Sequence, residues 1–127
     1  MNKKIVVTAA ILAAITIAIG AFGAHGLKKL VDASSLASFE TGVRYQMYHA
    51  LALFVIGLTP SISEILKRRI FWLFIGGIVL FSGSIYILSL QEVLLFSVKW
   101  SAFATPLGGL SFIIGWVWLA IGVFKSN

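Results

Sequence analysis

The chain has 127 residues, of which 60% are hydrophobic and 11% are charged, and its formal net charge is +6. Typical water-soluble domains are about 45–50% apolar and about 25% charged, so this composition excludes an ordinary soluble domain. The absence of cysteine excludes disulfides and thiolate chemistry. The basic residues lie at the ends of apolar runs rather than in a stripe, so we expect no nucleic-acid partner.

Four apolar runs predict an all-α, polytopic membrane protein. They cover residues 5–24, 42–59, 70–90 and 105–124, and we expect the second span to begin at Phe39 and cover 39–59. About 20 residues of helix, at about 1.5 Å each, cross a ~30 Å hydrocarbon core. The first run is longer than the ~7–15 apolar residues of a cleaved signal peptide, so we expect it to be retained. The prediction is one domain over residues 1–127, an antiparallel bundle of four transmembrane helices.

The distribution of positive charge predicts how the bundle is oriented. With four spans, both termini and the connection between the second and third spans share one end. That end holds six basic residues: Lys3, Lys4, Lys67, Arg68, Arg69 and Lys125. The other end holds Lys28, Lys29 and Lys99. Because cytoplasmic loops carry the excess of Lys and Arg, we predict cytoplasmic termini and a multi-pass protein of the plasma or inner membrane.

The helix ends are marked by residues that cap helices. Gly26 would end the first helix as a left-handed cap, and Asp32, Ser34 and Ser35 are candidate N-caps for the second. The segment 61–64, Ser-Ile-Ser-Glu, has the form of a capping box for the third helix. Thr105 followed by Pro106 would open the fourth.

Small residues recur at helical spacings that let helices approach closely in lipid. We interpret these positions as helix-packing seams inside the bundle. They are Ala10, Ala14 and Ala18 on the first span, Gly76 and Gly83 on the third, and Gly108, Gly115 and Gly122 on the fourth.

The start of the second span carries a candidate polar cluster. At 100° per residue, Glu40, Arg44 and Tyr48 form one stripe of this helix, and Tyr45 and His49 form a neighbouring stripe. Glu40 and Arg44 are four residues apart, so an ion pair near the outer interface is the structural interpretation. The functional alternative is a site for an ion, a proton or a polar head group, because ionisable residues within membranes commonly mark function. The cluster consists of Glu40, Arg44, Tyr45, Gln46, Tyr48, His49 and His25.

The two histidines differ in expected depth. His49 lies near the middle of the second span, where we favour an interhelical hydrogen bond over a proton relay. His25 lies at the end of the first helix, where we expect a solvated capping role. Neither has the spacing of a metal or haem ligand set, and no catalytic motif is present. We therefore predict no catalytic residues, no metal, no cofactor and no enzymatic activity.

Four blocks of sequence resemble the signature blocks of the YgdD/YwdK-like family of small membrane proteins, domain of unknown function 423. They are Gly20–Leu27, Phe39–Leu51, Leu80–Tyr86 and Thr105–Trp116, and the resemblance extends over essentially the whole chain. It implies a four-helix integral membrane protein of the bacterial plasma membrane. It implies no activity, since the family has none established. The characteristic positions are His25, Glu40, Arg44, Tyr45, Gln46, Tyr48, His49, Thr105 and Pro106.

We expect such a protein to act by helix association, as an accessory or scaffolding subunit or as a homo-oligomer. Its expected partners are membrane lipids and either a second copy of the chain or another membrane protein. The alternative is a small transporter or channel for an ion, a proton or a solute that uses the polar cluster. A weaker alternative is a lipid- or quinone-binding protein.

Overall fold

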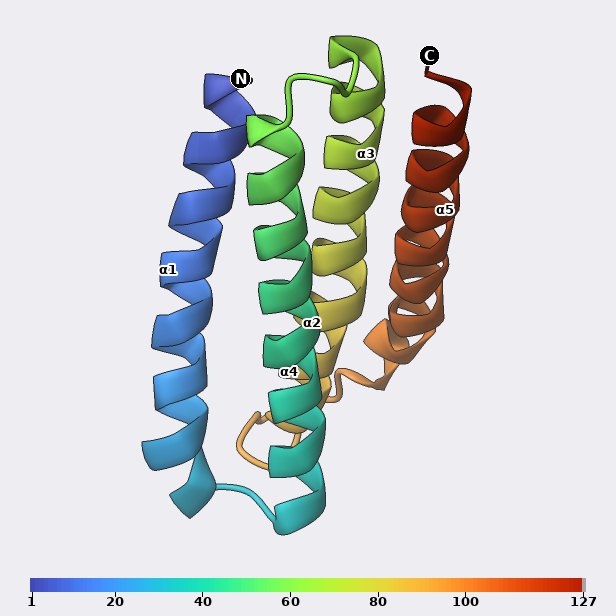
Figure 1. Ribbon diagram of the computed structural model, residues 1–127. Helices are drawn as coiled ribbons and strands as arrows, with labels where there is room; N and C mark the ends of the chain where they lie inside the picture. The colour runs from blue at the N-terminus through green and yellow to red at the C-terminus, as the bar shows by residue number, and fades with distance from the viewer. Residues whose placement is uncertain (127) are drawn as a thin grey trace.

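The computed structural model describes residues 1–126, and every regular element in this part of the chain is helical. The elements are α1 (Lys3–His25), η1 (Leu27–Lys29), α2 (Ala33–Leu58), α3 (Glu64–Gly77), η2 (Ile78–Ser82), α4 (Gly83–Ser89), η3 (Lys99–Phe103) and α5 (Ala104–Lys125). The five residues of η2 are π-helical and join α3 to α4 without a break, so that Glu64–Ser89 forms one continuous rod, the third along the chain. Four helical rods therefore lie side by side, with both termini and the α2–α3 loop at one end (Figure 1).

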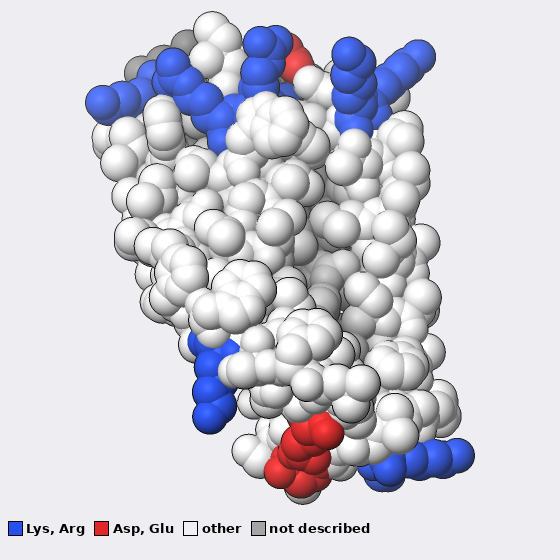
Figure 2. Space-filling view, turned by 180° about the vertical axis from the view of Figure 1, so that it is seen from behind, with Lys and Arg blue, Asp and Glu red and all other residues white. Residues whose placement is uncertain are grey.

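Three of the rods are long and apolar enough to cross a membrane: Lys3–Lys29, Glu64–Ser89 and Lys99–Lys125. The rod formed by α2 does not reach this standard, because Arg44, Gln46 and His49 interrupt its apolar sequence. On the face drawn in Figure 2, charged side chains gather toward the two ends and the middle is uncharged. Such a band is the surface that lipid tails require.

The core lies between the rods and is mainly apolar, although polar side chains such as Gln46, His49 and Ser82 are also buried there. α1 packs along α2, α2 packs along η2 and α4, and α5 packs along α3 and η2. The buried core residues are Ile5, Ala9, Leu53, Ile56, Leu66, Ile70, Phe74, Ile78 and Phe112.

α1 turns a different face to α2 from the one we predicted. The predicted seam of Ala10, Ala14 and Ala18 is wrong, since all three are exposed. The small residues buried on α1 are Ala9, Thr16 and Gly23, which follow one another at intervals of seven. Because several alanines share this helix, their spacing alone did not identify the inward face.

α5 presents glycines to large side chains of the facing rod. A Cβ added at Gly108, Gly115 or Gly122 would collide with Phe81, Phe74 or Leu66, respectively. The facing rod reciprocates at a position other than those predicted: a Cβ at Gly77 would collide with the Phe112 ring of α5. At Gly76 a Cβ would lie 3.9 Å from Ser111, and at Gly83 it would meet only a carbonyl of its own helix 4.0 Å away. Each of the two rods thus places large residues against glycines of the other, and close approach requires glycine at 77 but not at 76 or 83.

Two of the expected helix boundaries are correct and three caps differ. α1 ends at Gly26, but with φ −72° rather than in the left-handed region, because the chain continues directly into η1. Asp32 is the N-cap of α2, as predicted. Ser63, rather than the box beginning at Ser61, caps α3 by accepting the N–H of Leu66. α5 continues from η3 without a side-chain cap, so Thr105 is free to bond elsewhere.

Candidate functional site

His49 lies in an aromatic cage between α2, α3 and α5. The ring is 4% exposed and stacks on Phe112, with 3.6 Å between ring centroids and 12° between planes. Phe74 meets it edge-on at 4.8 Å. Both ring nitrogens are hydrogen-bonded: Nδ1 lies 2.7 Å from the carbonyl oxygen of Tyr45, and the indole N–H of Trp116 donates to Nε2 at 3.1 Å.

These two contacts fix the chemical state of the imidazole. An indole nitrogen can only donate, so Nε2 of His49 must accept and is unprotonated. The ring proton is therefore on Nδ1, which donates to the Tyr45 carbonyl. A second proton on Nε2 would face the Trp116 N–H directly. The site holds a neutral histidine whose hydrogen-bonding capacity is used, and a proton relay would have to break the contact between α2 and α5.

A second polar contact joins α2 to the third rod. The Tyr86 hydroxyl donates to Oε1 of Gln46 at 2.6 Å, and the Ser82 hydroxyl donates to the carbonyl oxygen of Gly42 at 2.7 Å. Ser82 lies in the π-helical turn and is fully buried, as Gln46 nearly is. A side chain at Gly42 would collide with the Tyr86 ring, so this ring packs directly against the α2 backbone. Among the described residues, no buried side-chain nitrogen or oxygen lacks a partner.

The other members of the predicted cluster point away from this interior. Glu40, Arg44, Tyr45 and Tyr48 are exposed on the outer face of α2, with Tyr48 55% exposed. The expected Glu40–Arg44 ion pair is not formed: the Arg44 guanidinium donates to the Thr41 hydroxyl at 3.0 Å. The structure thus divides the cluster into a buried pair, Gln46 and His49, and an outward polar face. Local spacing showed which residues share a stripe but not which stripe the neighbouring helices cover.

His25 lies at the far end of α1 and is exposed. His49 is sixteen residues into α2, or about 24 Å along its axis from the helix start, so the two histidines cannot share one metal ion. Among residues 1–126, no group of three or more His, Asp or Glu side chains lies close enough to hold a metal.

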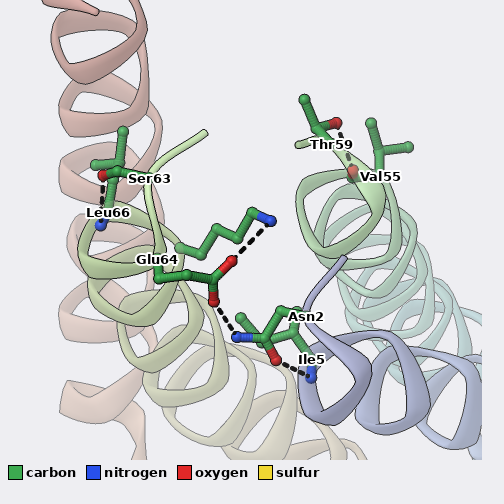
Figure 3. A network of polar contacts seen from close by, with 8 residues as sticks. Asn2, Ile5, Val55, Thr59, Ser63, Glu64 and Leu66 are labelled. Carbon is green, nitrogen blue, oxygen red and sulfur yellow. Dashed lines mark hydrogen bonds and ion pairs between the residues drawn. The ribbon is translucent and has the colours of Figure 1, made fainter. Parts of the chain in front are cut away.

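A terminal clasp, formed by Asn2, Gly57, Glu64 and Lys67, joins three helices at the end that carries the termini. The backbone N–H of Asn2 donates to the Gly57 carbonyl at 2.8 Å, and its side-chain oxygen caps α1 through the N–H of Ile5. Its amide nitrogen donates to Oε2 of Glu64 at 2.6 Å (Figure 3). The other oxygen of Glu64 accepts from Nζ of Lys67 at 3.0 Å.

Lys67 is the largest fully buried side chain, with 1% exposure. A buried ammonium needs an opposite charge, and Glu64 supplies it from one turn earlier on α3. Sequence analysis counted Lys67 among the basic residues of the end that carries the termini and did not single out Asn2 or Glu64 as functional. The three-residue spacing of Glu64 and Lys67 is a signal from which the ion pair could have been predicted. Nothing local indicates that Asn2, 62 residues away from Glu64, completes the contact.

Sequence comparison identifies the family. A family model described as "Protein of unknown function (DUF423)" matches residues 19–109. The chain belongs to the DUF423 family. The resemblance of the four sequence blocks is thereby confirmed.

Relatives of this DUF423 protein are named as membrane proteins. The UPF0382 membrane protein YwdK of Bacillus subtilis is 42% identical, over 97% of this chain and 98% of its own length. The UPF0382 membrane protein SSP2132 of Staphylococcus saprophyticus is 41% identical, over 97% and 98%. The UPF0382 inner membrane protein YgdD of Escherichia coli is 38% identical, over 98% and 92%. No solved structure matches the chain.

In this DUF423 membrane protein, the inward polar groups are arranged to join helices. Three hydrogen bonds of α2 link it to another rod, at Trp116 of α5 and at Ser82 and Tyr86 of the third rod. Hydrogen bonds between helices in lipid contribute about 0.6 kcal/mol on average and up to ~1.7 kcal/mol. The exposed polar side chains on the outward face of α2 take part in none of these hydrogen bonds between rods.

Proposed function

We propose that this DUF423 protein crosses the plasma membrane four times with cytoplasmic termini, and that it acts by association through the outward polar face of α2. That face consists of Glu40, Thr41, Arg44, Tyr45 and Tyr48. The protein would then be a homo-oligomer, or an accessory or scaffolding subunit of another membrane protein. The proposal assigns no reaction to the chain.

A fourth crossing by α2 follows from how the rods are connected. α1 and the third rod are both long and apolar enough to span, and α2 connects them. The α1–α2 connection lies at one end and the α2–α3 connection at the other (Figure 1). A helix of 26 residues covers about 39 Å, which is sufficient for the hydrocarbon core. The polar side chains that lower the hydropathy of α2 are tolerated because Gln46 and His49 are bonded inside the bundle.

The observation that carries the association is the position of Arg44. A side chain added at Gly20 of α1 would lie 3.3 Å from Val43, so Arg44 lies at about the depth of Gly20. Gly20 is four residues inside the end of the first apolar run, or roughly 6 Å below its border. A charged residue at the bilayer centre costs at least ~2.5–3.5 kcal/mol, and the cost falls toward the interface. An exposed Arg44 without a carboxylate partner therefore favours coverage by another protein surface.

A second copy can supply the missing partner. The Arg44 guanidinium turns back to Thr41, close to the depth of Glu40. In a parallel pair of protomers related by a two-fold axis along the membrane normal, Arg44 of each copy reaches Glu40 of the other. Such an isologous contact is self-complementary, as closed dimers require.

Cysteine cross-linking in native membranes tests this, and the chain contains no other cysteine. Tyr48→Cys is expected to give a disulfide-linked dimer. Ile113→Cys on α5, which is 61% exposed against 55% for Tyr48, is the control and is expected to stay monomeric. Glu40→Arg should abolish the dimer, and adding Arg44→Glu should restore it. The proposal would be contradicted if Tyr48→Cys and Ile113→Cys cross-linked equally and the protein was strictly monomeric in mild detergent and captured no partner.

The four-span topology has its own test. Ser126→Cys at the terminal end and Phe96→Cys at the other end are both exposed positions. A membrane-impermeant maleimide applied to intact cells is expected to label Phe96→Cys only. Labelling of both, or of Ser126→Cys alone, would contradict the orientation.

Two alternatives have specific tests. Transport by one protomer would need a polar path through the bundle. In proteoliposomes, transport predicts a flux of ions or protons with the wild-type protein that is reduced in the Glu40→Gln and His49→Ala variants. Absence of any protein-dependent flux would count against transport. Lipid or quinone binding is favoured by an apolar groove of about 410 Å³ between α2 and α5, whose walls include Tyr48, Val55 and Trp116. Elongated density in that groove would support this reading.

A further inference from the structure

A furrow between α1 and α3 opens at the end that carries most of the basic residues. It is lined by Asn2, Lys4, Ile5, Arg68, Phe71 and Trp72 and has a volume of about 300 Å³. Figure 2 shows Lys and Arg side chains standing at this end above a hollow between uncharged side chains. The terminal clasp holds the two walls together, because Asn2 begins α1 and bonds to Glu64 of α3.

The three consecutive basic residues of α3 point in different directions. Successive residues turn by about 100°, so Lys67, Arg68 and Arg69 cannot share a surface. Lys67 is buried in the terminal clasp, Arg69 lies over the Trp118 ring at 5.2 Å on the α5 side, and Arg68 lines the furrow.

Lys4 and Arg68 have no carboxylate partner in the described structure. Among the described residues, Glu64 is the only Asp or Glu at this end of the bundle. Both of its carboxylate oxygens are hydrogen-bonded, one to Lys67 and the other to Asn2. Within residues 1–126, the Lys67–Glu64 contact is the one ion pair. Two exposed cations on adjacent helices thus line one opening, together with Asn2 and the apolar residues Ile5, Phe71 and Trp72.

We propose that this furrow binds an anionic phospholipid of the cytoplasmic leaflet. Lys4 and Arg68 hold the headgroup phosphate, and Asn2 offers an amide at the same level. Phe71, Trp72 and Ile5 line the part nearer the membrane centre, where acyl chains descend, and Trp72 is 64% exposed. The charge selects an anionic lipid, and the apolar floor selects a lipid over a free anion. This inference does not depend on association through α2.

The expected effect follows from the energy of basic residues at an anionic surface. Each Lys or Arg contributes about 1 kcal/mol, and 1.4 kcal/mol is a tenfold change in affinity. Lys4→Gln and Arg68→Gln should each weaken binding about fivefold, and the double variant about thirtyfold.

Native mass spectrometry of the delipidated, detergent-solubilised full chain measures this, with phosphatidylglycerol as the probe. Phosphatidylcholine, inorganic phosphate and brominated-chain phosphatidylglycerol serve as comparison probes. Arg69→Gln and Lys125→Gln are matched controls at the same end of the bundle, expected to change phosphatidylglycerol affinity less than twofold. Brominated chains should quench tryptophan fluorescence in the wild type, and the quenching should be reduced in Trp72→Phe.

Three results would overturn the proposal. Equal losses in all four single variants would show diffuse attraction to a charged end rather than a site. Phosphatidylcholine binding as strongly as phosphatidylglycerol would remove the role of charge. Inorganic phosphate displacing the lipid at comparable concentration would show that the ligand is a soluble anion. Folding of each variant is checked by its melting temperature, so a lost signal can be separated from a lost fold.

Discussion

Substitution of Gly108 by alanine tests the close contact between α5 and the third rod. The added Cβ would lie 2.7 Å from Cβ and 2.8 Å from Cα of Phe81, and it would also collide with the Phe81 backbone nitrogen. Those atoms belong to the backbone or its first carbon, so no rotamer change can move them aside. The neighbouring Gly109 is a matched control, because a Cβ there would lie 3.7 Å from the Phe81 ring, which is ordinary contact.

The magnitude follows from the displacement required. Ordinary contact begins at 3.4 Å, so relieving the contact with Cβ of Phe81 alone requires α5 to move from η2 by roughly 0.7 Å, and the closer Phe81 backbone nitrogen requires a larger movement. Overpacking of this kind costs about 1–3 kcal/mol. Alanine also favours a helix by about 1 kcal/mol over glycine, but this gain is the same at both positions and cancels in the comparison. Gly108→Ala should therefore be about 1–3 kcal/mol less stable than Gly109→Ala.

Reversible unfolding in mixed micelles, titrated with SDS and followed by tryptophan fluorescence, measures this difference. Gly109→Ala is expected to match or exceed the wild type in stability. If Gly108→Ala proves as stable as Gly109→Ala, the two backbones do not approach as closely as the structure indicates. The inference that small residues of α5 receive large residues of the third rod would then fail.

Two further predictions concern hydrogen bonds. Trp116→Phe keeps an aromatic ring but removes the donor to Nε2 of His49, so the free energy of unfolding should fall by about 0.6–1.7 kcal/mol. ¹⁵N spectra should show the Nδ1–H tautomer of His49 in the wild type and a changed Nε2 signal in this variant. Trp118→Phe is the control and should leave the His49 signals unaltered. The Ser35 backbone N–H lowers the pKa of Asp32 below its usual value. A lowered pKa means that the cap stabilises fully above about pH 3.9 and is lost as pH falls through the folded-state pKa. Asp32→Asn caps without titrating, so its melting temperature should fall less between about pH 5 and 3; identical pH profiles would refute this.

Local sequence was sufficient to place the helices. The apolar runs lie within α1, α2, the third rod and α5, because hydropathy and helix length are properties of contiguous residues. Asp32 and Gly26 marked boundaries correctly for the same reason, since a cap acts on its own helix. The family resemblance also rested on short contiguous blocks.

The direction in which a side chain points was not available from local sequence. Glu40 and Arg44 had the spacing of an ion pair, yet Arg44 bonds to Thr41 on the outer face. The choice between Ala9 and Ala10 as the inward residue of α1 depends on where α2 lies. Periodicity defines stripes on a helix, but only the neighbouring helices select the stripe that is buried.

Hydropathy and charge along the chain are enough to predict a helical protein with a lipid-compatible surface and most of its positive charge at one end. The tertiary structure alone decided the contacts between distant residues: Trp116 with His49, Tyr86 with Gln46, and Asn2 with Glu64. The hydropathy of a helix is the sum over its own consecutive residues, so each apolar helix can be predicted from its own segment alone. A hydrogen bond requires two atoms to be positioned within a few tenths of an ångström, and that position depends on how the helices that carry them pack together.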